Sequence, residues 1–197
     1  PEIDRPTYLA ARREQVREKL SKVLTSLPGD SLRFPNTSVG QGYTRGCMRV
    51  LVEGTTLFRT SSLENEVLEV KVGSAVMSIV NAGKLSNGTQ GVVTGFVVSS
   101  TPSPFPMHPL VRWSSKLHGV FEERVDPIVV QLEGARASRS DALTELLACM
   151  PISGADAMTV HKAVGQTLSN GVVLDCSGGF PAMHQLYEAL SRPPSFR

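Results

Sequence analysis

The chain has 197 residues and a mass of 21.2 kDa, which suits one large domain or two small ones. Hydrophobic residues make up 41% and charged residues 19% of it, so the composition favours a packed core and excludes a disordered chain. Twenty basic and eighteen acidic residues leave a formal charge of +2, which excludes a protein that binds nucleic acid over a strongly basic surface. Any nucleic-acid site must therefore be local.

The cysteines and the apolar runs give expectations about the environment of the protein. Cys47, Cys149 and Cys176 are widely spaced and form neither a C-x-x-C pair nor a zinc-ligand pattern with histidine. We expect them to be reduced structural thiols of an intracellular protein. No apolar run approaches the roughly 18 residues of a membrane span, and we expect no membrane partner.

Residues 1–46 are expected to hold one helix and one loop. From Thr7 to Leu27, apolar residues recur at helical spacing among charged residues, which predicts an amphipathic helix. Pro28-Gly29-Asp30 should end that helix, because proline cannot continue it and glycine accepts the left-handed cap. The stretch up to Gly46 is rich in Gly, Ser, Asn and Thr, and is predicted to be a loop.

Residues 47–134 change to short Val-rich runs that are broken by Gly, Pro and Asn. Alternation and β-branching predict strands, and so many short strands suggest a small barrel or sandwich. Asn87-Gly88 is expected to form a tight turn. The runs predicted to be strands are MRVLVEG, TLFRTS, EVLEVKVG, AVMSIVN, GVVTGFVVSS, PLVRW and PIVVQLEG.

The same β-rich part contains a Pro-rich run, TPSPFPMHP, at residues 101–109. It is expected to be a connector, because proline cannot take part in a central strand. His108 and His118 are expected to lie in loops without a partner. The aromatic residues expected in the core of this part are Phe96, Trp113 and Phe121.

Residues 135–197 return to an α/β pattern. Ser138–Met150 and Ala155–Leu168 carry apolar residues at helical spacing and are predicted to be helices. Val172–Cys176 is predicted to be a buried parallel strand whose end meets solvent. A last helix should begin near Pro181 and end at Pro193-Pro194. Its predicted packed face consists of Met183, Leu186, Tyr187 and Leu190.

Two segments of this last part are the most specific in the chain: Met158–Gly165, MTVHKAVG, and Gln185–Arg192, QLYEALSR. They resemble the fifth and sixth motifs of Pif/RecD-like superfamily 1B DNA helicases, T-(I/V)-H-K-(S/A)-Q-G and Q-x-Y-V-A-L-S-R. Leu68–Met77 and Leu85–Gly91 resemble further segments of that family in the same order. The resemblance covers about two-thirds of the chain, with Val164 in place of Gln and Glu188 in place of Val.

The resemblance implies a fold of the α/β plus β class. A partial RecA-like domain of the P-loop-NTPase type, called 2A, would carry a small inserted Src-homology-3-like β-barrel, called 2B. Residues 1–46 and 135–197 would belong to 2A, and residues 47–134 would form 2B. The chain would then be the C-terminal 2A/2B portion of an ATP-dependent 5′-to-3′ DNA helicase of the nucleus or mitochondrion.

The resemblance also implies roles for individual residues. Arg192 would be the arginine finger, which places positive charge on the γ-phosphate during hydrolysis. Gln185 and Tyr187 would lie near the nucleotide or couple it to DNA, and Gly165 would allow the backbone to approach the phosphates. The residues expected to hold the phosphates of single-stranded DNA, without reading its sequence, are Thr159, His161 and Lys162.

ATP and Mg²⁺ would be cofactors of the full-length enzyme. The sequence has no G-x-x-x-x-G-K-(S/T) loop, since the Gly83-Lys84 pair is followed by Leu85. We therefore expect the chain alone to bind neither cofactor and not to hydrolyse ATP. The missing first RecA-like domain would be supplied in cis, or by a partner protein in trans. Two alternatives stay open: a degenerate helicase remnant that serves as a structural or assembly subunit, and an adaptor that binds peptide or nucleic acid through its barrel.

Overall fold

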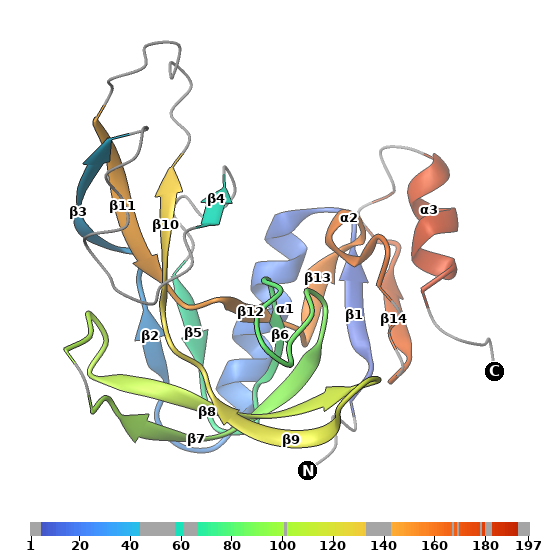
Figure 1. Ribbon diagram of the computed structural model, residues 1–197. Helices are drawn as coiled ribbons and strands as arrows, with labels where there is room; N and C mark the ends of the chain where they lie inside the picture. Colours follow the sequence, from blue (N-terminus) through green and yellow to red (C-terminus); the bar gives the residue numbers. More distant parts are fainter. Residues whose placement is uncertain are drawn as a thin grey trace.

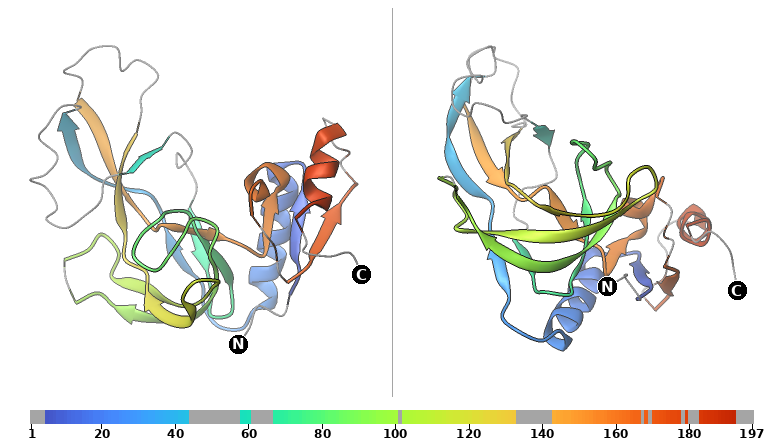
Figure 2. Two further views of the ribbon diagram at one scale, coloured as in Figure 1. Left: turned by 45° about the vertical axis from the view of Figure 1, so that its right-hand side comes forward. Right: turned by 60° about the horizontal axis from the view of Figure 1, so that its bottom comes forward.

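The computed structural model has a mixed α/β architecture in which the described strands form four sheets (Figure 1). An α/β part with a parallel sheet lies beside a β-rich part, as both views of Figure 2 show. Among the described residues, no helix is both long and apolar enough to cross a membrane. The structure describes residues 5–43, 58–60, 67–100, 102–132, 143–166, 168, 170–177, 179 and 183–192.

The α/β part is built on a three-stranded parallel sheet. β1 (Thr7–Ala10) lies between β13 (Ala157–Thr159) and β14 (Val172–Asp175). Ala10 is in register with both Thr159 and Asp175, so the three strands end at one edge of the sheet. The helices of this part are α1 (Arg13–Ser26), α2 (Val160–Ala163) and α3 (Met183–Leu190).

The helix predicted from Thr7 begins later than its sequence pattern indicates. Thr7–Ala10 form the central strand β1, and α1 begins at Arg13. Leu9 and Ala10 are both fully buried, and a short strand covered on both faces carries no alternation that would distinguish it from a helix. The predicted end is confirmed, because the N–H of Leu27 closes the last turn and Gly29 has a φ of 81°.

The loop predicted up to Gly46 is also wrong where the structure describes it. β2 (Leu32–Phe34) pairs with β5 (Leu68–Val70), and β3 (Thr37–Tyr43) pairs with β11 (Leu143–Cys149). Both pairings join segments far apart in the sequence. A residue composition typical of loops becomes strand when such a partner is available, because strand preference depends strongly on context.

The β-rich part contains a five-stranded antiparallel sheet and a four-stranded sheet. The order in the first is β12 (Ile152–Gly154), β6 (Ala75–Ser78), β7 (Gln90–Val98), β8 (Met107–Ser115) and β9 (Gly119–Arg124). The order in the second is β3, β11, β10 (Ile128–Leu132) and β4 (Phe58–Thr60). The run MRVLVEG and Cys47 lie outside the described residues.

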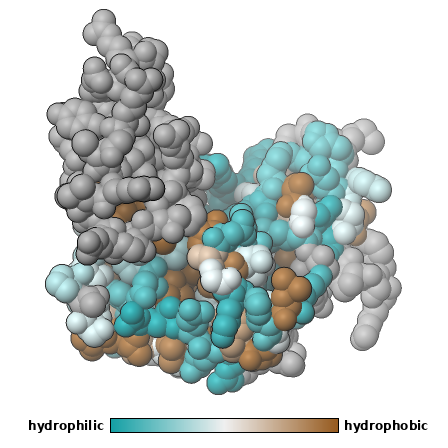
Figure 3. All heavy atoms as spheres, viewed as in Figure 1, coloured by the Kyte–Doolittle hydropathy of each residue, from teal (hydrophilic) through white to brown (hydrophobic). Residues whose placement is uncertain are grey.

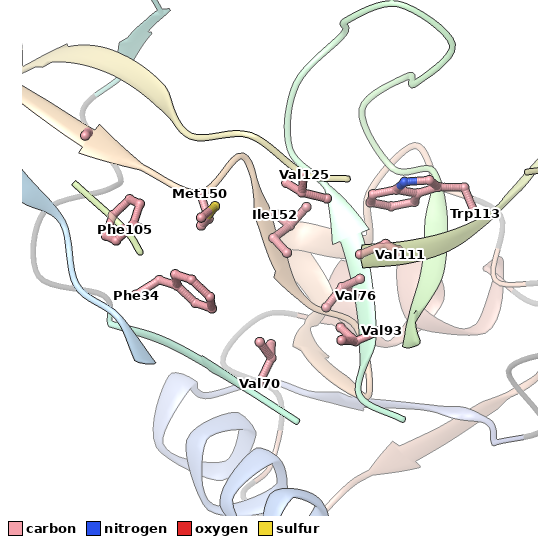
Figure 4. Packing of buried hydrophobic residues seen from close by; sticks show 11 residues of the cluster. Phe34, Val70, Val76, Val93, Phe105, Val111, Trp113, Val125, Met150 and Ile152 are labelled. Atoms are coloured by element: carbon pink, nitrogen blue, oxygen red, sulfur yellow. The ribbon is translucent and has the colours of Figure 1, made fainter. Parts of the chain in front are cut away.

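A cluster of buried apolar side chains joins the five-stranded sheet to the β2–β5 pair (Figure 4). Trp113 is fully buried in it, and the rings of Phe34 and Phe105 meet edge to face at 5.6 Å between centroids. Phe96 and Phe121 pack against the same cluster. The core position expected for the three aromatic residues Phe96, Trp113 and Phe121 is therefore confirmed.

The segment predicted as the helix Ser138–Met150 contains strand β11 instead. Its leucines match a helical period, but Leu146, Leu147, Ala148 and Cys149 are all buried. The strand pairs with β10 on one side and with β3 on the other. A strand buried on both faces reads as a continuous apolar run, which removes the alternation that identifies strands.

The second predicted helix, Ala155–Leu168, is mostly not helical. Its first residues form β13 and only Val160–Ala163 form α2. The strand predicted at Val172–Cys176 is confirmed as the parallel strand β14, but the expected burial is wrong. Val173 is 47% exposed, because β14 is the last strand of the described sheet.

His108 corrects two expectations for the Pro-rich run. β8 begins at Met107 and lies between β7 and β9, so the end of the run does belong to a central strand. Pro109 lies just beyond the last β8–β9 pair, Leu110 with Arg124, so β9 does not need the N–H that proline lacks. Its carbonyl accepts a hydrogen bond from the Val125 N–H at 2.9 Å. His108 is buried, with Nδ1 2.7 Å from Asp126 Oδ1 and Nε2 3.0 Å from Ser103 Oγ.

His108 contacts Ser103 in the β7–β8 connection and Asp126 in the β9–β10 connection, so its ring joins these two connections. Burial alone would raise the pKa of Asp126, but hydrogen bonds from Arg124 and His108 outweigh it and lower that pKa below its ordinary value. His118 does lie in the exposed turn before β9. The turn expected at Asn87-Gly88 is confirmed too, with a φ of 92° at Gly88.

Candidate functional site

The fifth-motif segment turns sharply at the carboxyl edge of the parallel sheet. Thr159 ends β13 and caps α2, because its Oγ1 accepts a hydrogen bond from the Lys162 N–H at 3.4 Å. Val160 and Ala163 are buried and fix this turn to the core. His161 and Lys162, which lie between them, are both exposed. The local fold thus presents an imidazole and an ammonium group to solvent on a rigid base.

Gly165 follows this turn with a φ of 78°. A Cβ atom added there would meet nothing within 4 Å. The backbone conformation therefore requires glycine, whereas crowding does not. The surface next to Gly165 is open, which is compatible with a close approach by a ligand.

The sixth-motif helix α3 packs through a different face from the one predicted. Gln185 and Ala189 are buried, one turn apart. Leu186, Tyr187 and Leu190 are 39%, 77% and 41% exposed, so the predicted packed face is wrong for these three residues. The buried face consists of the Gln185 amide and the Ala189 methyl group, which do not form a hydrophobic period. The hydrophobic period of the sequence therefore predicts the wrong face. The Met183 side chain and the flanking prolines lie outside the description.

The two motifs meet at His161 and Gln185. Their Nε2 atoms are 3.5 Å apart, which places the buried Gln185 amide against the ring of the exposed His161. The other amide atom of Gln185, Oε1, is buried and has no hydrogen-bond partner among the described residues. A half-turn of the amide would present this acceptor to the imidazole. The structure thus brings one predicted DNA contact and one predicted nucleotide contact together.

Arg192 lies at the end of α3 and folds back onto that helix. Its Nε donates to the Glu188 carbonyl at 2.9 Å, and its NH2 nitrogen donates to Ser191 Oγ at 2.6 Å. Its carbonyl accepts from the Leu168 N–H at 3.1 Å. The backbone position is therefore fixed, and the guanidinium group is held by a neutral carbonyl and a neutral hydroxyl.

An open groove lies between α1 and the turn at α2, and we call it the α1–α2 groove. Figure 3 shows hydrophilic residues over the part of this face where α2 and α3 lie in Figure 1. Gln185, Tyr187 and Arg192 do not line this groove. The polar residues that line it and matter here are Arg13, Arg17, Lys71, Thr159, His161 and Lys162. The predicted DNA contacts thus share one surface, together with Gly165.

A second polar cluster at the same sheet edge was missed in the sequence. Asp175, at the end of β14, accepts hydrogen bonds from the Tyr8 hydroxyl, from Gln15 Nε2 at 2.9 Å and from the Ser177 N–H at 2.8 Å. Hydrogen bonds from Ser177 and then Tyr8 lower the pKa of Asp175 from 3.8 to about 2. The only sign of this cluster in the sequence is the solvent-exposed end predicted for the strand Val172–Cys176. The sequence pattern places Tyr8 in a helix and so does not predict its contact with Asp175.

Asp156 links the α/β part to the β-rich part. Its carboxylate is 2.8 Å from Arg5 NH2 and accepts from the Ala75 N–H of β6 at 3.0 Å. Burial raises the pKa of Asp156 and outweighs the opposite effect of Arg5. Within the described ranges, no group of His, Cys, Asp or Glu is arranged to hold a metal ion. Cys149 is a buried free thiol and Cys176 an exposed one.

Sequence comparison relates the chain to DNA helicases of Trypanosoma brucei brucei. No protein-family model matches it. It is 45% identical to ATP-dependent DNA helicase PIF4 over 53 residues, which are 27% of this chain and 6% of that protein. It is 28% identical to ATP-dependent DNA helicase PIF6 over 196 residues, which are 95% of this chain and 21% of that protein.

Two solved structures share the fold. The Pif1 helicase from Candida albicans matches with a TM-score of 0.75 and 29% identity, over 98% of this chain and 44% of that chain. Bacteroides Pif1 bound to single-stranded DNA matches with a TM-score of 0.62 and 20% identity, over 96% of this chain and 38% of that chain. The chain therefore spans less than half the length of each of these relatives.

Proposed function

From the premise that the homologues of this chain are Pif1-family helicases, we propose that it is the 2A/2B portion of an ATP-dependent 5′-to-3′ DNA helicase. The observation that carries the proposal is the capped turn at Thr159, which exposes His161 and Lys162 along the α1–α2 groove. An ammonium group and an imidazole on a rigid turn suit the phosphates of a single strand, which carry charge but no sequence information. A Bacteroides relative with the same fold was solved with single-stranded DNA.

The proposal extends to the domain organisation. The parallel sheet with α1, α2 and α3 would be the core of the 2A part of a RecA-like domain, which would comprise residues 1–46 and 135–197. Residues 47–134 would be the inserted 2B part, with a Src-homology-3-like barrel. What supports a β-rich insertion there is the antiparallel run of β6, β7, β8 and β9, which packs on the core around Trp113.

ATP and Mg²⁺ would be cofactors of the full-length enzyme, which gains from ATP hydrolysis the energy for movement along DNA. Arg192 would stabilise the charge that develops on the γ-phosphate, and the donors that now face Glu188 and Ser191 would turn to it. Exposed Tyr187 would lie beside the nucleotide, and Gln185 would connect it to His161. The phosphate cradle would come from a first RecA-like domain in cis or in trans, because the sequence has no P-loop.

Single-stranded DNA binding by the chain tests the proposal. Fluorescence anisotropy of a labelled oligo-dT, measured over a salt series, should give an affinity that falls as salt rises. Lys162→Ala should lower the magnitude of the slope of log K against log salt by about 0.7, the value for one contact with a single strand. The control is Lys116→Ala, which removes an exposed ammonium group from the β8–β9 turn. Absent or salt-independent binding would contradict the proposal, and an effect of Lys116→Ala alone would favour the barrel adaptor.

The alternative of a structural or assembly subunit is favoured by one observation. The exposed face of α3 carries Leu186, Tyr187 and Leu190, and exposed apolar groups in one place are typical of an interface. Val164, where the family has Gln, is also exposed. In that case the chain would not bind single-stranded DNA in the anisotropy experiment, even when it is fully folded.

A further inference from the structure

Helix α1 carries two arginines on the face that it turns to the α1–α2 groove. Arg13 and Arg17 are four residues apart, so they lie on one side of the helix and are separated by about 6 Å along its axis. Both side chains are exposed, and both line the groove that His161 and Lys162 also line.

The topology explains why these arginines lie near the fifth motif. β1 ends at Ala10, which is in register with Thr159 at the end of β13. α1 begins three residues after Ala10, and α2 begins directly after Thr159. The first turns of both helices therefore start at the same edge of the sheet, where Figure 1 shows the upper end of α1 close to α2. Ligands of parallel α/β sheets bind at this edge.

The charge of Arg13 and Arg17 is not neutralised within the described part of the chain. No ion pair or hydrogen bond of either side chain occurs there. The two nearest acids on α1, Glu14 and Glu18, form no ion pair with either arginine, and Glu18 pairs with Lys22 at 2.6 Å. The N-terminal end of the 14-residue helix α1 adds a partial positive charge close to Arg13.

The acidic groups of the groove are already paired. Of the described residues that line it, Arg13, Arg17, Lys71 and Lys162 are cationic, and Glu69 and Asp156 are anionic. Glu69 accepts from Ser31 Oγ at 2.7 Å and lies 3.7 Å from Arg33. Asp156 is paired with Arg5 at 2.8 Å. The surface thus has an excess of positive charge on the α1 side, which suits an extended polyanion.

We propose that Arg13 and Arg17 form a second row of phosphate contacts that faces the fifth motif across the α1–α2 groove. The inference rests on the proposed function and names further contacts of the same DNA track. Each guanidinium group offers paired donors that match the oxygens of a phosphate. Val16 and Leu20 lie on the same half-buried face of α1 and offer apolar surface to sugars and bases. The single strand would be held from two elements rather than from one turn.

The test compares single charge removals on one helix. Arg13→Gln, Arg17→Gln and the control Lys22→Gln each remove one positive charge from α1, but Lys22 does not line the groove. Anisotropy with labelled oligo-dT over a salt series should give slopes reduced by about 0.7 for each arginine variant and about 1.4 for the double variant. Lys22→Gln should leave the slope unchanged. Far-UV circular dichroism of each variant verifies that α1 is intact.

The outcomes separate this inference from the proposed function. If the unmodified chain binds no single-stranded DNA, both are overturned. If the unmodified chain binds and Lys162→Ala weakens binding, while both arginine variants behave like Lys22→Gln, this inference alone is overturned. Competition by an unlabelled duplex as effective as that by the single strand would overturn the assignment of the two rows to a single strand. Additive losses at Arg13 and Arg17, with weak competition by duplex, would support it.

Discussion

Asp175 is the residue at which the environment changes acid–base chemistry most clearly. It sits at the end of β14, outside the core, yet three neighbours donate hydrogen bonds to its carboxylate. These bonds stabilise the ionised form and hold its pKa at about 2. The pKa of its partner Tyr8 is raised to about 12, mainly by burial and further by the hydrogen bond to Asp175. The pair ties β1, β14 and the start of α1 together.

The lowered pKa of Asp175 predicts how stability depends on pH. Because the folded pKa is below the unfolded value of about 3.9, the contribution of Asp175 is present above that value and is lost as the pH falls toward the folded pKa of about 2. Asp175→Asn should remove this dependence. Urea unfolding between about pH 5 and pH 2 should show the unmodified chain losing stability faster than the variant. Parallel pH profiles would contradict the argument.

At the scale of elements, β7 contains a matched pair of glycines. A Cβ at Gly91 would lie 2.7 Å from Val111 Cγ1 and 2.8 Å from the Arg112 carbonyl oxygen, whereas a Cβ at Gly95 would meet nothing within 4 Å. Gly91→Ala should therefore destabilise the fold by about 1–3 kcal/mol, the usual cost of overpacking. Gly95→Ala, in the same strand, should change it by less than about 1 kcal/mol. Chemical denaturation of both variants measures the difference, and equal effects would refute this packing account.

The elements that sequence could predict are those with strong local signals. Gly88 forms the expected turn, β14 forms within the predicted strand Val172–Cys176, and Trp113 is in the core. β1 and β11 were predicted as helices because strands that are covered on both faces lose their alternation. β3 was predicted as a loop because its partner lies about a hundred residues away, in β11. Long-range pairing of this kind leaves no local pattern.

The candidate site divides in the same way. The exposure of His161 and Lys162 follows from a motif that is continuous in sequence, and Thr159 caps its helix locally. The contact between His161 and Gln185 joins residues 24 positions apart and depends on how α3 packs. The groove-facing arginines of α1 depend on the parallel register of β1 and β13. The fifth motif therefore predicts which side chains are exposed, whereas the residues that surround them depend on the fold.

For the whole molecule, the four sheets form two parts that are joined by specific contacts. Asp156 connects the start of β13 with Ala75 of β6, and Met77 of β6 packs in the same buried cluster as Leu9 of β1. β3 and β11 lie before and after residues 47–134 and share one sheet with β10. A hydrogen bond and buried packing therefore join the part that carries the fifth motif to the β-rich part. Binding at the α1–α2 groove acts on a surface to which both parts contribute.

The central claim is that single-stranded DNA binds the α/β part at the α1–α2 groove, and hydrogen exchange tests it most directly. Amide exchange, followed by mass spectrometry with and without saturating oligo-dT, reports which segments the strand protects. The account predicts protection of residues 157–166 and of the first turns of α1, with unchanged exchange in the β8–β9 turn. Protection confined to residues 107–124, or no protection at saturating DNA, would contradict it.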